Sequence, residues 1–336
     1  MKKYKSYKTL LITADEQRLI FSNGFDAAIK TVEDAMVKRV KGEVLLPDKV
    51  SVVFDEDSQN RINCMPGALL NDDLYGVKWI SVFPSNADKG YRNVTGTIVL
   101  SDLKCGQTLS IMDAGYLTDI RTASMGAVAA KYLAKENTES IGFIGAGQQA
   151  RRHLDLVKVV RPMLKKCYVS SRSNNTVEAF IEEESLIHPD IEFIPCGNNY
   201  ERAVTDSDII VTAISGQEDI LKANWIKKGT FYIHVAGWED EYAVPKKASK
   251  IVCDDWECIK HRTQTISRMY KEGLLKDEDI YCNLEDILIN AKNGRENDEE
   301  FIYFCSVGLA FVDISFAKYA YERAIELGIG TWFEFA

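Results

Sequence analysis

Residues 140–150 read Ser140-Ile141-Gly142-Phe143-Ile144-Gly145-Ala146-Gly147-Gln148-Gln149-Ala150, and this stretch decides the fold of the chain. Its first five residues are typical of a short buried strand, and the apolar residues that follow from Ala150 to Val160 recur at helical spacing. A second apolar run, Cys167-Tyr168-Val169, comes next. Strand, glycine loop, helix and strand in this order predict a β-α-β unit.

The loop has the pattern Gly145-x-Gly147-x-x-Ala150, and each position has a physical reason. Gly145 permits a tight turn, Gly147 lets a pyrophosphate approach the backbone, and Ala150 is small enough for the helix to pack on the strand. The helix N-terminus offers free N–H groups and a partial positive charge to phosphates. An ordinary glycine turn is the alternative, but the order of strand, loop and helix favours a dinucleotide-binding loop.

The end of the second strand bears on the type of dinucleotide. An acidic residue there usually binds the ribose 2′-hydroxyl of NAD, but this sequence has Ser171, Arg172 and Ser173 and no carboxylate. A guanidinium group pairs well with phosphate, so the pattern favours NADP over NAD. A solvated surface charge is the alternative interpretation of Arg172.

The remaining pattern predicts two different domains. Apolar strands at 190–194, 208–213, 231–236, 250–253 and 301–304 alternate with helices and indicate a parallel sheet covered on both faces. The first 120 residues instead contain one clear helix, 25–40, and several closely spaced strands. A helix over 311–327 ends at Gly328. We therefore expect an α/β fold in which a Rossmann dinucleotide-binding domain, 121–307, accompanies a discontinuous α+β substrate and dimerisation domain, 1–120 and 308–336.

Composition excludes several classes of partner. The chain has 336 residues and a net charge of −9, which disfavours nucleic acid and anionic membranes as partners. Its eight cysteines form no Cys-x-x-Cys pair and several lie in apolar runs, as expected of reduced thiols in a cytoplasmic protein. The four histidines have no zinc-ligand spacing, so we expect no metal site.

Several motifs in this order resemble the ornithine cyclodeaminase/mu-crystallin family across nearly the whole chain. They are Met65-Pro66, Gly76-Val77-Lys78, Leu117-Thr118-Asp119-Ile120-Arg121-Thr122-Ala123, the glycine loop, Gly294-Arg295-Glu296-Asn297-Asp298-Glu299 and Ser306-Val307-Gly308-Leu309-Ala310-Phe311-Val312-Asp313.

The resemblance implies that Lys78 and Arg121 bind a substrate α-carboxylate, in agreement with the charge-assisted anion site that two cations near strand or helix ends would make. It also implies substrate contacts from Met65 and from Lys49, which stands where the family usually has arginine. The implied cofactor-binding residues are Thr122, Gly145, Ala146, Gly147, Gln148, Gln149, Ala150, Ser171, Arg172, Ser173, Thr212, Ala213, Ser306 and Asp313. Asp313 has an alternative role as a helix cap.

Two departures affect the expected chemistry. Asn63 stands where cyclodeaminases carry glutamate, and the family's Gly-Gly-Asp turn here reads Ala236-Gly237-Trp238-Glu239-Asp240. We expect Glu239, or failing it Asp240, to be the catalytic acid beside Lys78. Trp238 is expected to form either a pocket wall or a packing contact, and His234 to be a buried core residue.

These features predict an NAD(P)-dependent oxidoreductase that acts on the C–N bond of an amino acid through an imine. Dehydrogenation, ketimine reduction and oxidative hydrolysis of an N-substituted amino acid all fit, and Cys253-Asp254-Asp255-Trp256 resembles the branch that forms 2,3-diaminopropionate. The alternatives are a cyclodeaminase that forms proline and ammonia, and a mu-crystallin-like NADP-bound ligand-binding protein. The resemblance also implies a homodimer.

Overall fold

The computed structural model describes residues 6–55, 58–214, 217–235 and 237–335. The chain divides into two compact units: Met1–Arg121 with Leu309–Ala336, and Thr122–Gly308. The predicted boundaries, 120/121 and 307/308, each lie one residue before these. In the part of the chain that the structure describes, every helix is too short or too polar to serve as a membrane span.

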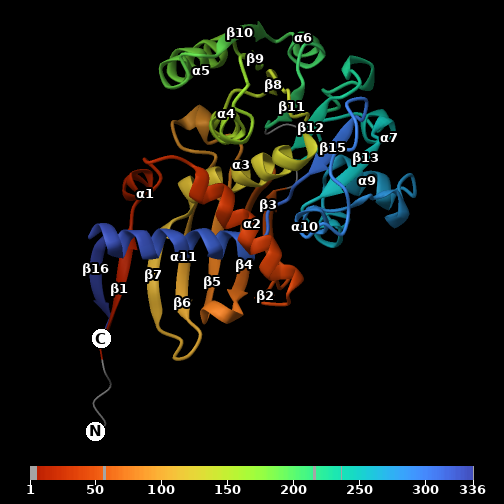
Figure 1. Ribbon diagram of the computed structural model, residues 1–336. Helices are drawn as coiled ribbons and strands as arrows, with labels where there is room; N and C mark the ends of the chain where they lie inside the picture. Colours follow the sequence, from red (N-terminus) through yellow and green to blue (C-terminus); the bar gives the residue numbers. More distant parts are fainter. Residues whose placement is uncertain (1–5, 56–57, 215–216, 236, 336) are drawn as a thin grey trace. The chain divides into compact units, whose positions relative to one another are not determined.

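The first unit is built on an eight-stranded mixed sheet, in the order β16-β1-β7-β6-β5-β4-β2, with β3 paired to β4 (Figure 1). Strands β1 and β7 run parallel, and the other neighbours are antiparallel. Its elements are β1 (Tyr7–Ile12), α1 (Ala14–Ile20), α2 (Asp26–Val40), β2 (Val44–Leu45), β3 (Val50–Asp55), β4 (Asn60–Leu69), β5 (Leu74–Val82), β6 (Val94–Asp102), β7 (Thr108–Asp113), the start of α3 (Ala114–Leu133), α11 (Ala310–Leu327) and β16 (Thr331–Phe335).

Helix α11 packs across β4, β5 and β6, and α2 packs against α11 (Figure 1). Two glycines allow this close approach. A Cβ on Gly67 would lie 3.1 Å from the backbone of Ala310, and one on Gly76 would lie 2.8 Å from the side chain of Ile314. Side chains of β5 alternate between the two faces: the even-numbered residues from Leu74 to Ile80 are buried on the helix side, and Trp79 is exposed on the other face.

The second unit contains an eight-stranded sheet in the order β10-β9-β8-β11-β12-β15-β13-β14, parallel throughout. Most of its central strands are buried along their whole length, as expected when helices cover both faces. The strands are β8 (Ser140–Ile144), β9 (Lys166–Ser170), β10 (Glu192–Gly197), β11 (Ile209–Thr212), β12 (Phe231–His234), β13 (Lys250–Cys253), β14 (Cys282–Asn283) and β15 (Ile302–Cys305). The helices are α4 (Gln148–Val160), α5 (Asn174–Ile187), α6 (Tyr200–Thr205), α7 (Ala243–Lys247), α8 (Trp256–Ile259), α9 (Thr265–Lys271) and α10 (Leu284–Leu288).

The predicted fold class is confirmed, and most predicted strands lie within two residues of their observed positions. Helices α1, α3 and α5 and strand β16, among other short elements, were not predicted from the sequence. Helix α3 is buried along most of its length, so its apolar residues show no one-sided periodicity. The strand predicted at 190–194 begins at Glu192 and continues to Gly197. All eight cysteines are free and five are buried, in agreement with reduced thiols.

Candidate active site

Three charged side chains meet in the interior of the first unit. The Oδ1 atom of Asp313 in α11 accepts a hydrogen bond from Lys78 Nζ in β5 at 2.7 Å. The Nε atom of Arg121 in α3 lies 2.9 Å from the same oxygen, as an ion pair without hydrogen-bond alignment. Lys78 and Asp313 are each only 1% exposed. Two cations thus share one oxygen of a single carboxylate.

The sheet geometry explains how Lys78 comes to be buried. Lys78 lies in the middle of β5, on the face covered by α11, and pairs directly with Met65 of β4. Arg121 lies within α3 rather than at its end. The prediction that these cations stand near element ends is therefore wrong. A buried ammonium group needs a partner, and Asp313 provides it.

The structure also shows that Asp313 does not cap a helix. The N-cap of α11 is Leu309, and Asp313 lies in the first turn, so the capping alternative is wrong. Lys49, the third predicted cation, lies partly exposed before β3. Asn63 is buried, and its side-chain oxygen accepts a hydrogen bond from Ser51 at 2.8 Å.

The glycine loop of the second unit has the geometry that a dinucleotide needs. Gly145 has φ +102°, and a Cβ there would lie 2.6 Å from the carbonyl oxygen of Ala213. Gly147 is the N-cap of α4, and no side chain caps this helix by a hydrogen bond from that position. A Cβ added to Gly147 would have no heavy atom within 4 Å. Ala150 is fully buried. Open space over Gly147 and an uncapped helix N-terminus fit a bound pyrophosphate.

The other predicted cofactor residues have different surroundings. Ser171 is partly exposed, and Arg172 and Ser173 are exposed after β9. Ser173 is the N-cap of α5 and makes no side-chain cap hydrogen bond. Thr212 is buried at the end of β11, where its hydroxyl lies 2.8 Å from the hydroxyl of Tyr232. Gln148 is exposed, Ala146 is buried, and Gln149 and Thr122 are partly exposed.

Two consecutive acids after β12 are completely buried. Glu239 Oε1 accepts the backbone N–H of Ile214 at 3.1 Å, and its Oε2 has no hydrogen-bond partner among the described residues. Burial raises the pKa of Glu239 to about 8, against the opposing hydrogen bonds from Thr212 and Ile214. Near neutral pH this side chain therefore retains its proton much of the time and has one oxygen to exchange it.

Asp240 lies in a polar cluster within the same core. Its Oδ1 accepts a hydrogen bond from Thr265 at 2.7 Å and one from Tyr303 at 3.5 Å, and it lies 3.4 Å from His234 Nε2. Burial raises the pKa of Asp240 to about 7. Burial also lowers the pKa of His234 to about 3, so the imidazole is neutral, as expected of a core histidine.

Ser306 contacts a further buried carboxylate, that of Asp254, to which the sequence assigned no role in the site. Asp254 Oδ2, just after β13, accepts hydrogen bonds from Ser306 Oγ at 2.8 Å and from the backbone N–H groups of Val307 and Gly308 at 2.9 and 3.0 Å. Asp254 thus fixes the turn that follows β15. In the sequence, the position of Asp254 directly after the apolar strand 250–253 could have indicated this structural role.

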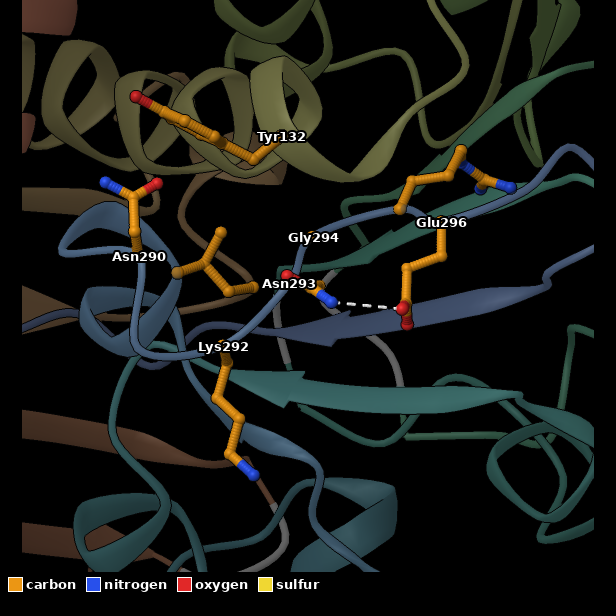
Figure 2. A pocket seen from close by; sticks show the side chains of 8 residues that line it. Tyr132, Asn290, Lys292, Asn293, Gly294 and Glu296 are labelled. Carbon is orange, nitrogen blue, oxygen red and sulfur yellow. Dashed lines mark hydrogen bonds between the residues drawn. The ribbon is translucent and has the colours of Figure 1, made fainter.

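A surface cavity of about 270 Å³ is lined by none of the residues predicted for the site (Figure 2). It lies among Tyr132, Asn290, Lys292 and the Gly294-Arg295-Glu296 motif. A Cβ on Gly294 would lie 2.5 Å from the carbonyl oxygen of Tyr132, and Arg295 donates hydrogen bonds to the carbonyl oxygens of Leu133 and Glu300. This motif therefore packs its own loop against the end of α3.

One cluster has side chains of metal-binding type. Asp155 of α4 meets Glu184 and His188 at the end of α5, with 2.9 Å between Asp155 Oδ1 and His188 Nε2. Arg152 contacts Asp155, and Arg151 Nε lies 3.7 Å from Glu184. Arg151 Nε lies closer to Glu183, at 2.9 Å, and burial raises the pKa of Glu184 to about 7. The cluster thus joins the two helices through polar contacts.

A sequence model of the ornithine cyclodeaminase/mu-crystallin family matches residues 13–328. The chain belongs to this family. A relative from Archaeoglobus fulgidus, alanine dehydrogenase, is 32% identical over 98% of this chain and 99% of its own length. The N-((2S)-2-amino-2-carboxyethyl)-L-glutamate dehydrogenase of Staphylococcus aureus, which represents the branch noted above, is 27% identical over 90% of this chain and 91% of its own length.

Solved structures of family members have the same fold. That of Thermococcus litoralis Δ1-pyrroline-2-carboxylate reductase, in complex with NADH and L-proline, has a TM-score of 0.90 and 32% identity over 96% of this chain and 99% of its own. An archaeal alanine dehydrogenase dimer with bound NAD has a TM-score of 0.87 and 29% identity over 98% and 100%. The chain thus groups with oxidoreductases that act on the C–N bond of amino acids.

The buried acids make stability depend on pH in a defined direction. The folded-state pKa values of Glu239 and Asp240 lie above their unfolded values, so the folded chain binds more protons between about pH 4 and pH 8. Stability should fall as pH rises through this window. We expect urea midpoints to decrease from pH 6 to pH 8.5, and to decrease less in Glu239→Gln. An equal decrease in the variant and the wild type would contradict a raised pKa for Glu239.

Proposed function

We propose that this chain is an NAD(P)-dependent oxidoreductase that interconverts an α-amino acid and its imine, with hydrolysis of the imine to a keto acid. The observation that carries the proposal is the buried cluster in which Lys78 and Arg121 share one oxygen of Asp313. Two neighbouring cations of this kind can make charge-assisted hydrogen bonds to a further anion. The α-carboxylate of an amino acid is such an anion.

In this proposal Lys78 and Arg121 bind the carboxylate by charge-assisted hydrogen bonds and thereby orient the Cα–N bond. Asp313 is a positioning residue, because it holds both cations while its second oxygen has no hydrogen-bond partner among the described residues. Met65, opposite Lys78 in the sheet, would contribute apolar contact on the same face. Lys49 would contribute a further positive charge.

Glu239 is proposed to hold the proton that the amine loses or gains. Its raised pKa keeps both protonation states populated near neutral pH, the condition that favours general acid–base catalysis. The backbone N–H of Ile214 fixes one carboxylate oxygen, so the other is the one that exchanges a proton. Asp240 is the second choice, because Thr265 and Tyr303 already engage its Oδ1.

A nicotinamide dinucleotide, when bound, supplies hydride acceptance and donation at the substrate carbon. The residues that would hold it are those of the Gly145–Ala150 loop, whose open space over Gly147 supports the assignment. We propose NADP as the preferred form, on the basis of Arg172 and the two serines beside it. The solved structures of the two relatives contain NADH and NAD. The preference for NADP therefore rests on the residues that follow β9 in this chain alone.

We further propose that the chain forms a homodimer in the cytoplasm. The face of the first unit's sheet opposite α11 exposes a row of apolar side chains that includes Val50, Val52 and Trp79, with Val50 and Trp79 62% and 49% exposed. A row of this kind is typical of an interface with a second protein. The archaeal alanine dehydrogenase is a dimer, which supports a second copy as the occupant. Free cysteines are in accord with a reducing compartment.

The carboxylate assignment predicts separate effects on substrate and cofactor. Lys78→Met and Arg121→Met should each lower kcat/KM for the amino acid roughly 10- to 100-fold, because one charge-assisted hydrogen bond is lost. The Kd for NADP, measured by fluorescence titration, should stay within about twofold. Lys318→Met, a change at a partly exposed lysine of α11, is the control. Wild-type kinetics in both variants would remove the carboxylate site.

The cofactor preference predicts an asymmetric response to charge reversal. Arg172→Glu should weaken NADP binding roughly 10- to 100-fold and leave NAD binding within about twofold, because the 2′-phosphate loses its cation. Calorimetric titration of both dinucleotides measures this, with the exposed Lys165→Glu as a control. Equal losses for the two dinucleotides would show that Arg172 does not bind the 2′-phosphate.

The dimer predicts that a charge on the exposed sheet face separates the copies. Trp79→Glu should shift the mass measured by light scattering from that of two chains to that of one. Leu186→Glu, at an exposed leucine of the second unit, should leave the mass unchanged. A monomeric wild-type protein at micromolar concentration would refute the dimer.

A further inference from the structure

Two carboxylates and an imidazole meet between α4 and α5, at a point of the second unit that the proposed chemistry does not use. One oxygen or nitrogen atom from each of Asp155, Glu184 and His188 lies within 4.8 Å of the other two. His188 Nε2 is 2.9 Å from Asp155 Oδ1 and 3.8 Å from Glu184 Oε2. Because Glu184 and His188 are four residues apart at the end of α5, the helix places both on one face.

These separations are close to those between the ligands of a small cation. Zinc binds imidazole nitrogen and carboxylate oxygen at about 2.0–2.2 Å, so two ligands of a tetrahedral site lie about 3.4 Å apart. The two distances from His188 Nε2 fall on either side of that value. Small movements of side chains would therefore bring all three atoms to one zinc ion.

One oxygen of the cluster lacks a hydrogen bond. Glu184 is only 1% exposed, and its Oε2, the atom nearest to His188, has no hydrogen-bond partner among the described residues. A buried carboxylate oxygen that has lost its water without gaining a partner costs free energy. A cation bound between Glu184 and His188 would satisfy this oxygen.

The neighbouring arginines contact other oxygens. Arg152 contacts Asp155 through Oδ2, whereas Oδ1 is the oxygen that faces His188. Arg151 Nε lies 2.9 Å from Glu183 and 3.7 Å from Glu184 Oε1. Carboxylates that bind a metal are commonly hydrogen-bonded through their second oxygen, so Arg152 fits the role of an outer partner that orients Asp155.

The topology separates this cluster from the dinucleotide loop. Helix α5 leads from the carboxyl end of β9 to the amino end of the parallel strand β10. His188 follows α5 and therefore lies toward the amino ends of the strands, whereas the Gly145–Ala150 loop follows the carboxyl end of β8. A metal ion at this place would join two helices and take no part in hydride transfer.

We propose that Asp155, Glu184 and His188 bind a zinc ion, with water as the fourth ligand, and that the ion stabilises the second unit by joining α5 to α4. The side chain of His188 is 12% exposed, which gives the ion and the water access from solvent. The expectation of no metal site rests on the spacing of histidines and cysteines. Such spacing cannot reveal a cluster in which two of the three ligands are carboxylates from different helices.

The test compares zinc binding by the full chain and by variants that lose one ligand. Protein that a chelator has freed of metal is titrated with zinc in a calorimeter, and its Tm is measured with and without saturating zinc. We expect one zinc ion per chain, and a Kd that is weaker by at least roughly 100-fold in Glu184→Gln and in His188→Gln. Glu183→Gln, at the exposed neighbour, is the matched control and should bind zinc as the wild type does.

The change in Tm separates a metal ligand from a residue that only packs. Zinc should raise the Tm of the wild type and of Glu183→Gln, and should leave that of Glu184→Gln unchanged, because a ligand stabilises only the folded chain that binds it. A loss of packing alone would lower the Tm of Glu184→Gln equally with and without zinc.

Cobalt in place of zinc identifies the ligands by its absorption spectrum. Nitrogen and oxygen ligands give no thiolate charge-transfer band, whereas binding at one of the eight cysteines does. We expect a cobalt spectrum without that band, and its loss in His188→Gln. Zinc binding that is equal in the wild type and both ligand variants, a thiolate band, or no zinc binding at all would overturn the proposal.

Discussion

The interior of the first unit depends on one oxygen atom. Asp313 Oδ1 lies within 3 Å of both Lys78 and Arg121, and these three residues come from a strand and two helices that are distant in the sequence. Each partner alone would be a buried, unpaired charge, which folding tolerates poorly. Together they form a cluster in which the carboxylate offsets the cost of burying the two cations. The packing of one strand and two helices thus brings two positive groups to one point of the fold.

The second unit places its polar groups at the carboxyl ends of buried strands. The glycine loop follows β8, the exposed serines and Arg172 follow β9, and the two buried acids follow β12. Parallel strands bring all of these ends to the same edge of one sheet. Burial raises the pKa of Glu239 and Asp240 there, whereas Arg172 stays in contact with solvent. One edge of the sheet therefore carries both solvent-exposed and fully buried polar groups.

The sequence was most informative where local chemistry is decisive. The loop from Gly145 to Ala150 needs glycine and a small residue for reasons that act over a few residues, and it could be predicted without a structure. Pairings between distant residues could not. Nothing adjacent to Asp313 shows that it contacts Lys78, which lies 235 positions earlier. Helix α3 escaped prediction because burial on most sides removes the periodicity that reveals a helix.

The glycines beneath α11 have a consequence for mutational tolerance. An added Cβ on Gly67 would lie 3.1 Å from the backbone of Ala310 and Phe311, so a methyl group there would push α11 outward, whereas a Cβ on Gly76 would first meet the carbonyl oxygen of Val99 in β6, at 2.4 Å. Asp313 is part of α11, so an outward shift of the helix would move its carboxylate away from Lys78 and Arg121. A glycine-to-alanine substitution, which changes no charge, could in this way weaken the ion pairs of Asp313 with Lys78 and Arg121. The absence of a side chain at the glycine thus helps to set the distances between charged groups.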